Sequence, residues 1–330
     1  MHQEAVTVGS GVGGVDRTGV SRAVGVLCGT GVVVALIALP AVIPRFWVGL
    51  VTEMLILGLA GMAVNVLLGY GGSLPFGHAA FYAAGAYTTA ILLTKTRLPW
   101  PLVLVLAPLV AAALGAIFGV LVARLYRFYY AMMTTALSML VWSLVRKGGG
   151  MTGGDNGITG VEIGPAVDSI ERGYWFVLAV VLVSAAVLWL IVDSPFGWTL
   201  RAIRENSTRT AFSGVDVVAH RHVAFIVSSF FTGVAGMLYV VYSHSTFPDY
   251  AHWVKSGDFV MVCILGGMLS FFGPMVGAAI LTILHTVVTS YTLYWPLIIG
   301  IVICIAVLVA PDGVTPLLTR LRARSMSGRP

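Results

Sequence analysis

Residues 100–122 read WPLVLVLAPLVAAALGAIFGVLV and contain no charged side chain. A helix of this length rises about 35 Å, which is enough to cross the hydrocarbon core of a bilayer, about 30 Å thick. Uninterrupted apolar runs of this length are typical of membrane spans rather than of soluble cores. The stretch therefore predicts a transmembrane helix and sets the class of fold.

The composition of the whole chain agrees with a membrane protein. Of its 330 residues, 58% are hydrophobic and 10% are charged, whereas a soluble domain has about 45–50% apolar and about 25% charged residues. These side chains supply too little polar surface to cover a soluble globule. The net charge of +6 is assigned to loops that face anionic lipid headgroups. Nucleic-acid binding is not expected, because no basic segment is interleaved with aromatic residues.

Apolar segments recur along the chain and predict an all-α, polytopic membrane fold. Most of them reach the roughly 20 residues that cross a bilayer as a helix. About ten segments are predicted, at 23–43, 46–69, 75–94, 100–122, 128–145, 174–193, 222–243, 259–272, 274–292 and 294–310. The segments at 75–94 and 259–272 are short or interrupted by glycine, so each is either a half-helix, a re-entrant piece or a full span.

The distribution of Lys and Arg predicts the orientation. Ten crossings place both termini on one side, and cytoplasmic loops are enriched in these residues. With both ends in the cytoplasm, 12 of the 19 basic residues lie inside, namely Arg17, Arg22, Arg124, Arg127, Arg201, Arg204, Arg209, Arg221, Arg320, Arg322, Arg324 and Arg329. The other 7 lie outside, namely Arg45, Lys95, Arg97, Arg146, Lys147, Arg172 and Lys255. The bias favours an N-in, C-in arrangement.

The same pattern divides the chain. Residues 1–22 are predicted to be a flexible cytoplasmic tail, 23–310 the membrane domain and 311–330 a basic cytoplasmic tail. The predicted outer loop at 146–173 is rich in glycine. The predicted inner loop at 194–221 is charged and has the pattern of a short amphipathic helix.

The inner loop carries helix signals at both ends, because Pro195 suits a helix start and Gly214 a helix end. Its apolar face is predicted to hold Leu200, Ile203 and Ala211, and its solvated face Arg201, Arg204 and Glu205. A helix of this kind either lies in the lipid headgroups or docks in a groove of a cytoplasmic partner. The residues alone leave both possibilities open.

Few ionisable side chains fall inside the predicted spans, where a charge is costly and usually functional. Glu53 either lines a path through the membrane or lies at an interface between helices or with the headgroups. His78 follows Pro75 and Gly77, which break the helix and allow close approach of another backbone. This histidine either packs between helices, lines a path, or acts as a metal ligand or catalytic group.

A second segment resembles this break. Residues 71–77, GGSLPFG, are similar to 266–273, GGMLSFFG, which has one extra residue. Transporters often carry paired broken segments, with the substrate site between them. Candidates for a substrate path are Asn65, Gly72, Ser73, Phe76, Gly77, His78 and Thr134. The alternative role of the polar side chains Asn65, Thr134, Thr135 and Ser138 is to form hydrogen bonds with neighbouring helices.

No catalytic pattern is present: the sequence lacks GxSxG, HExxH and the phosphate loop GxxxxGK[ST]. We therefore expect no catalytic residue, metal site or cofactor in this chain, and ATP, if used, is hydrolysed by another chain. Cys28, Cys263 and Cys304 lie far apart in apolar runs, and we interpret them as small core residues.

Four blocks of sequence, within about residues 46–318, resemble the permease subunits of branched-chain amino-acid ABC transporters, of the LivM type. The first block runs from LGYGG at Leu68 through FGHAAF to GAY at Tyr87. The other three are TGGDNG at 152–157, a block from SPFG at Ser194 to GVAG at Gly236, and a block from LGG at Leu265 to APDG at Gly313. They occur in the order and spacing of the family.

The resemblance implies an importer in the bacterial cytoplasmic membrane that works by alternating access. It implies a second permease chain, two ATP-binding subunits that bind ATP and Mg²⁺, and a soluble binding protein outside. The coupling helix that contacts the ATPase corresponds to Arg201, Ala202, Ile203, Arg204, Glu205, Asn206 and Gly214. The residues that would face the binding protein are Gly153, Gly154, Asp155, Asn156 and Gly157.

The resemblance leaves the substrate open. Branched-chain amino acids are the first expectation, but relatives also import urea, short amides and aromatic acids. Pro75 stands where the family usually has serine, and Arg221-His222 stands where it has a basic pair that ends in lysine. A stand-alone secondary transporter is the alternative of another class, and it would need coupling-ion groups that the predicted spans largely lack.

Overall fold

A computed structural model describes residues 31, 34–41, 43–96, 98–164, 167, 169–292, 294–309 and 313. The chain divides into two units, Met1–Arg45 and Phe46–Pro330. In the first unit, residues 34–41 are helical. The predicted tails at 1–22 and 311–330 lie outside the described residues, apart from Gly313. The second unit holds the predicted site.

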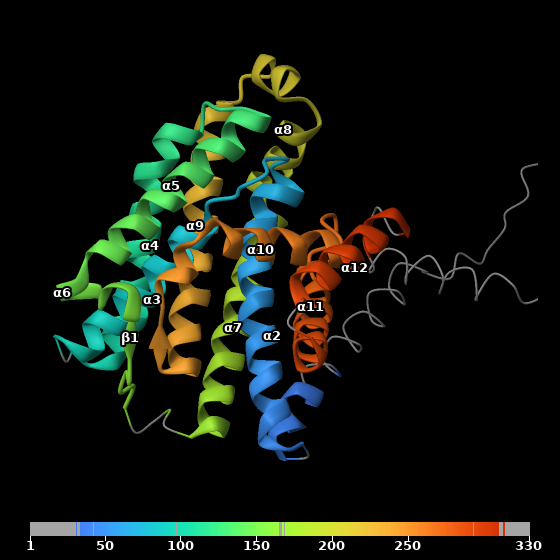
Figure 1. The fold of residues 1–330 in the computed structure, drawn as a ribbon. Helices are drawn as coiled ribbons and strands as arrows, with labels where there is room; N and C mark the ends of the chain where they lie inside the picture. The colour runs from blue at the N-terminus through green and yellow to red at the C-terminus, as the bar shows by residue number, and fades with distance from the viewer. Residues whose placement is uncertain are drawn as a thin grey trace, which may run out of the picture. The chain divides into compact units, whose positions relative to one another are not determined.

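The second unit is almost entirely helical, as predicted (Figure 1). Its helices are α2 (Arg45–Asn65), η1 (Val66–Tyr70), α3 (His78–Thr94), α4 (Trp100–Val122), α5 (Arg127–Lys147), α6 (Gly149–Thr152), η2 (Gly154–Asn156), α7 (Ile170–Val192), α8 (Pro195–Phe212), α9 (Val217–Ser243), η3 (Pro248–Ala251), α10 (Trp253–Gly266), α11 (Gly273–Tyr291) and α12 (Trp295–Val309). The sequence did not predict the two short strands β1 (Ile158–Thr159) and β2 (Ser245–Thr246), which pair antiparallel.

Six of the described helices are long and apolar enough to cross a membrane: Arg45–Tyr70, Trp100–Val122, Arg127–Lys147, Ile170–Val192, Val217–Ser243 and Gly273–Tyr291. The chain is therefore polytopic, whereas the count of ten spans and the orientation stay predictions. Helix α3 has 17 residues and α10 has 14. At about 1.5 Å per residue, both are shorter than the roughly 30 Å hydrocarbon core.

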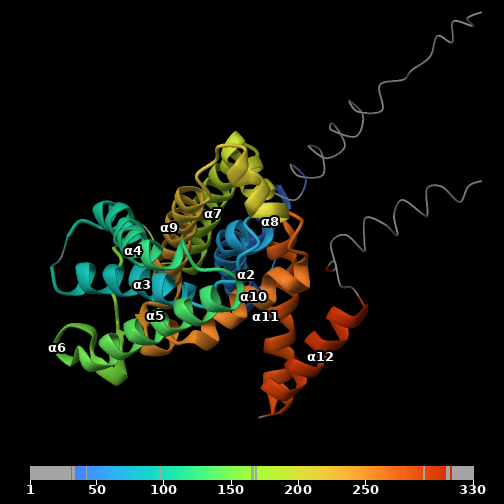
Figure 2. The ribbon, with the colours of Figure 1, turned by 90° about the horizontal axis from the view of Figure 1, so that it is seen from above.

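The position of the predicted segment 259–272 needs a correction. The helix there is α10, which begins at Trp253 and ends at Gly266. It begins earlier because the His252 side chain caps its first turn by accepting a hydrogen bond from the Val254 backbone. It ends earlier because Gly267, with φ of 109°, has a conformation that a helix does not allow. Figures 1 and 2 both show α10 lying across the axes of α2 and α9.

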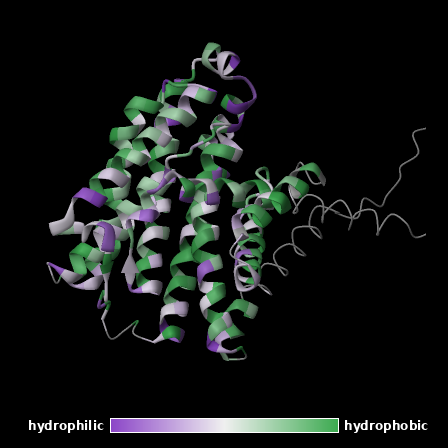
Figure 3. Cartoon of the chain, in the orientation of Figure 1, coloured by the Kyte–Doolittle hydropathy of each residue, from purple (hydrophilic) through white to green (hydrophobic). Residues whose placement is uncertain are grey.

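Helices α2 and α9 form the centre of the unit. In their most apolar stretches, 78% and 72% of the residues are buried, whereas the values for α5 and α7 are 17% and 33%. The outer helices nevertheless remain apolar on their exposed faces, as Ile117, Leu144 and Leu190 show. In Figure 3 hydrophobic residues run along the helices, and many of the hydrophilic residues lie near helix ends. Exposed apolar faces of this kind suit contact with lipid or with another membrane chain.

Glycines bring α9 against α3. A Cβ atom on Gly85 would lie 2.1 Å from the carbonyl oxygen of Gly233, and one on Gly236 would lie 1.9 Å from that of Tyr82. Neither position tolerates a side chain without movement of the backbone. Small residues at such contacts are the common means by which membrane helices pack closely.

Candidate permeation and coupling site

The predicted break between the second and third apolar segments is present. Helix α2 continues into the π-helical turn η1, and the chain is then non-helical from 71 to 77 until α3 begins at His78. Gly72 has φ of 65°, which favours glycine. Single π-helical turns are rare and are frequent at functional sites.

The second broken segment lies against the end of α2 and η1, where the first break begins. The amide nitrogen of Asn65 donates to the carbonyl oxygen of Ser270 at 3.5 Å, across 205 positions of sequence. A Cβ atom on Gly69 would lie 2.1 Å from the carbonyl oxygen of Met268. The second similar segment, 266–273, thus packs against the end of α2 and η1, directly before the first break at 71–77.

Phe76, Gly77 and Thr134 form the contact between the first break and α5. The hydroxyl of Thr134 accepts a hydrogen bond of 3.2 Å from the backbone nitrogen of Phe76. A Cβ atom on Gly77 would lie 2.3 Å from the Thr134 carbonyl oxygen. Of the other path candidates, Gly72 is exposed and Ser73 is partly exposed.

His78 lies in a packed interior. Its ring is fully buried and makes edge-to-face contacts with Phe81 and Phe225. Its Nε2 atom hydrogen-bonds the hydroxyl of Ser228 at 2.8 Å, and that hydroxyl donates to the carbonyl oxygen of Ala63 at 2.7 Å. These contacts favour the packing alternative that the sequence left open. The path-lining role stays a prediction.

Helix α8 begins at Pro195, as predicted, but it is not one continuous helix. Asn206, with φ of −157° and ψ of 97°, breaks it into two pieces. The Asn206 side chain accepts a hydrogen bond of 2.9 Å from the backbone nitrogen of Arg209 and so caps the second piece. Asparagine favours such local bonds over a helix interior. The predicted loop 194–221 also ends early, because α9 begins at Val217, where Asp216 caps it.

The predicted faces of α8 are confirmed in part. Leu200 and Ile203 are buried, as expected. Ala211 is exposed, because it lies on the second piece, beyond the break, and therefore does not continue the apolar face.

Arg204 and Glu205 are exposed, as expected, and Arg201 is partly buried. The sequence did not predict that both arginines contact η1, the turn before the first break. The guanidinium of Arg204 donates to the Gly69 carbonyl oxygen at 2.6 Å. The guanidinium of Arg201 lies 5.0 Å from the ring centre of Tyr70.

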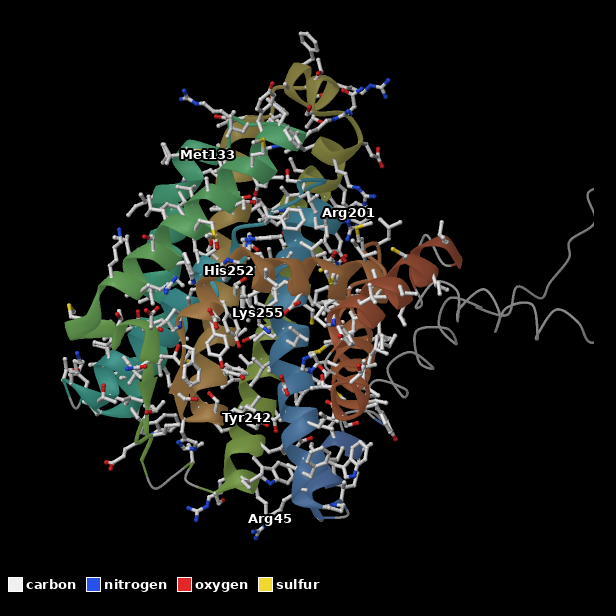
Figure 4. The ribbon with its side chains drawn as sticks, viewed as in Figure 1. Arg45, Met133, Arg201, Tyr242, His252 and Lys255 are labelled. Carbon is white, nitrogen blue, oxygen red and sulfur yellow. The ribbon has the colours of Figure 1, made fainter. Side chains whose placement is uncertain are left out.

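An open pocket of about 700 Å³ lies where α8 meets the two breaks. It is lined by Gly69, Tyr70, Arg201, Arg204, Glu205 and Leu269. Figure 4 shows Arg201 near the end of the unit that carries α8. A force on α8 therefore acts directly on the residues that connect α2 to the broken segment.

The predicted outer loop is shorter than 146–173, because α5 extends to Lys147 and α7 begins at Ile170. Gly153, Gly154 and Gly157 all have positive φ, so the turn itself requires glycine there. The loop pairs with the connection after α9 through β1 and β2, at the opposite end of the unit from α8 (Figure 1).

The exposed carboxylate of Asp155 in this loop binds the guanidinium of Arg146. This hydrogen bond holds the pKa of Asp155 below its usual range. Asn156 is also exposed.

Sequence reasoning missed a set of aromatic side chains. Trp198 and Phe212 on α8 are 58% and 89% exposed. Tyrosines from α3, α9 and η3 gather near Glu53 of α2. No pattern in the sequence indicated this cluster, because its members lie up to about 200 positions apart. Only Glu53, a charge within a predicted span, pointed to the region. Cys304, interpreted as a core residue, is exposed, whereas Cys263 is buried as expected.

Comparisons with known proteins agree with the resemblance in the sequence. The family described as "Branched-chain amino acid transport system / permease component" matches residues 46–309. The chain is 28% identical over 321 residues to the high-affinity branched-chain amino acid transport system permease protein LivM of Salmonella typhimurium, covering 89% of this chain and 75% of that protein. It is 27% identical over 320 residues to LivM of Escherichia coli, covering 88% and 75%.

The chain also resembles the probable branched-chain amino acid transport permease protein LivH of Methanocaldococcus jannaschii, with 29% identity over 160 residues, 44% of this chain and 49% of that protein. No solved structure matches the chain. The family match covers most of the sequence, and it includes both broken segments and α8. The chain therefore belongs to the branched-chain amino-acid transport permease family, and it is a multi-pass membrane component of a transport system.

Proposed function

We propose that this chain is a permease subunit of an ATP-driven importer of branched-chain amino acids in the bacterial cytoplasmic membrane. It works with a second permease, two ATP-binding subunits that hold ATP and Mg²⁺, and a soluble binding protein. The printed function of the LivM relatives supports the substrate class. The likeness to a LivH permease supports a second chain of the same kind.

The observation that carries the proposal is the direct bond between α8 and η1, the turn that leads into the first break. The second piece of α8 ends in Phe212, which is 89% exposed. When the two ATP-binding subunits close on each other, the subunit that binds this aromatic end can move α8. Arg204 passes the movement to Gly69, and Arg201 passes it to Tyr70.

The two breaks then act as the moving part of the permeation path. Both lie at the ends of apolar helices, and Asn65 and Gly69, which precede the first break, contact the second break. When the first break shifts, the second break shifts with it. The second permease chain supplies the opposite wall of the permeation path. This arrangement gives alternating access without a coupling ion, because the energy enters through α8.

The outer loop receives the binding protein. Asp155 and Asn156 project from a turn that three glycines and the Arg146 contact hold in one shape. A preformed, exposed turn loses little conformational entropy when a partner docks on it.

The test is purification of the tagged chain from native membranes, followed by ATP hydrolysis and leucine uptake in proteoliposomes. We expect an ATPase and a second permease to co-purify, and leucine with the binding protein to stimulate hydrolysis. Phe212→Ser should lower recovery of the ATPase, whereas Tyr291→Ser, at a side chain that is 85% exposed on α11, should not. A chain that purifies alone and takes up leucine only with a proton gradient would be a secondary transporter instead.

A further inference from the structure

Four tyrosines from three elements meet beside α2. This tyrosine cluster consists of Tyr82 on α3, Tyr239 and Tyr242 on α9, and Tyr250 in η3. The rings of Tyr239 and Tyr250 are 5.0 Å apart, and the Tyr250 hydroxyl donates to that of Tyr239 at 3.3 Å. The ring of Tyr82 lies 6.0 Å from that of Tyr239. Phenylalanine would supply the same packing area without bringing hydroxyl groups into the membrane region.

Glu53 of α2 faces this cluster. Its carboxylate lies within electrostatic reach of all four tyrosines. One helical turn earlier, a Cβ atom on Gly49 would lie 3.1 Å from the Tyr242 hydroxyl, so Tyr242 packs against the same face of α2. No described Lys, Arg or His lies within ion-pair distance of Glu53. A carboxylate in a membrane span without a cationic partner is costly and is a functional candidate.

The carboxylates that act on the cluster are those of Glu53 and Asp249. Lys255 of α10 forms an ion pair of 3.3 Å with Asp258, which compensates its charge. Asp249, next to Tyr250, adds a second negative group at the outer edge. Figure 4 places Lys255 and Tyr242 in the region between α9 and α2. A carboxylate that is surrounded by aromatic rings and has no compensating cation provides a suitable binding site for an ammonium group.

We infer that Glu53 and the tyrosine cluster bind the α-ammonium group of an amino acid in transit through the membrane. This inference rests on the proposed function for the identity of the ligand. The carboxylate supplies the opposite charge, and the ring faces and hydroxyls replace the water that the ammonium loses. The ring of Tyr82 lies 5.4 Å from that of Phe259, so the site adjoins α10.

The first experiment uses proteoliposomes that contain the complete transporter with its ATPases and binding protein. Glu53→Gln should lower leucine uptake about tenfold or more, because a charge-assisted contact is lost. Hydrolysis of ATP stimulated by the binding protein should persist. Glu53→Asp should recover part of the uptake. The matched control is Glu171→Gln, the same change at an exposed carboxylate in the first turn of α7.

A second measurement does not depend on transport. Saturation-transfer NMR on the purified transporter should show contact with 3-methylbutylamine, which has the ammonium but no carboxylate, and none with 4-methylpentanoate. The amine signal should disappear in Glu53→Gln and weaken in Tyr250→Phe. An unchanged amine signal in Glu53→Gln, or uptake at the wild-type rate, overturns the inference. Wild-type transporter that binds the amine but imports no leucine would instead contradict the proposed substrate.

Discussion

At the residue scale, the contact between α3 and α9 depends on the absence of one side chain. In Gly236→Ala the new Cβ atom would stand 1.9 Å from a backbone oxygen of Tyr82, so the helices must separate. We expect a loss of about 1–3 kcal/mol, the usual cost of overpacking. Thermal unfolding of the purified protein measures it. Gly300→Ala on α12 is the control, because no atom lies within 4 Å of its added Cβ.

Asp155 gives the outer turn a dependence on pH. Its folded pKa is depressed by the Arg146 hydrogen bond, so the stabilisation is fully present above the unfolded pKa, about 3.9, and is lost as pH falls through the folded pKa. Asp155→Asn should therefore raise amide exchange in residues 149–160 at pH 7. The difference from the wild type should shrink in acid. Glu162→Gln, at an exposed carboxylate of the same loop, should leave exchange unchanged at either pH.

At the scale of elements, α8 matters through its attachment to the break rather than through its own stability. Arg204→Gln removes the charged donor to the Gly69 carbonyl oxygen, an interaction of about 1.5–3 kcal/mol. We expect the complex to assemble and to hydrolyse ATP, while leucine uptake per ATP falls several-fold. Arg124→Gln, at an exposed arginine between α4 and α5, is the control. An equal loss of leucine uptake per ATP in both variants would show that positive charge at this end of the unit matters and that the contact between Arg204 and Gly69 does not.

At the scale of the whole molecule, the proposal fixes which ends of the helices face the cytoplasm. A membrane-impermeant maleimide applied to intact cells should label Asn156→Cys and leave Ser213→Cys unlabelled until the membrane is opened. Both positions are exposed. The native Cys28 and Cys304 are replaced by serine in the background, and Cys263 is buried. Labelling in the reverse order would place α8 outside and exclude its contact with a cytoplasmic ATPase.

The apolar runs and the turn residues of the sequence were sufficient to predict much of this structure. Span 100–122 and helix α4 coincide, because 23 apolar residues in a row have no other stable arrangement in lipid. The break before His78 and the start of α8 at Pro195 were predictable as well, because glycine and proline within these short stretches determine them. The family was evident for the same reason, since its blocks are continuous stretches of sequence.

Only the tertiary structure decided which residues meet. The bond from Arg204 to Gly69 crosses 135 positions, and the contact of Asn65 with Ser270 crosses 205. Glu53 was visible as a costly charge, but its tyrosine neighbours come from three other elements and share no pattern along the chain. Periodicity and turn chemistry describe a residue's near neighbours in sequence. Packing of helices against one another brings distant residues together, and in this chain it built the candidate site.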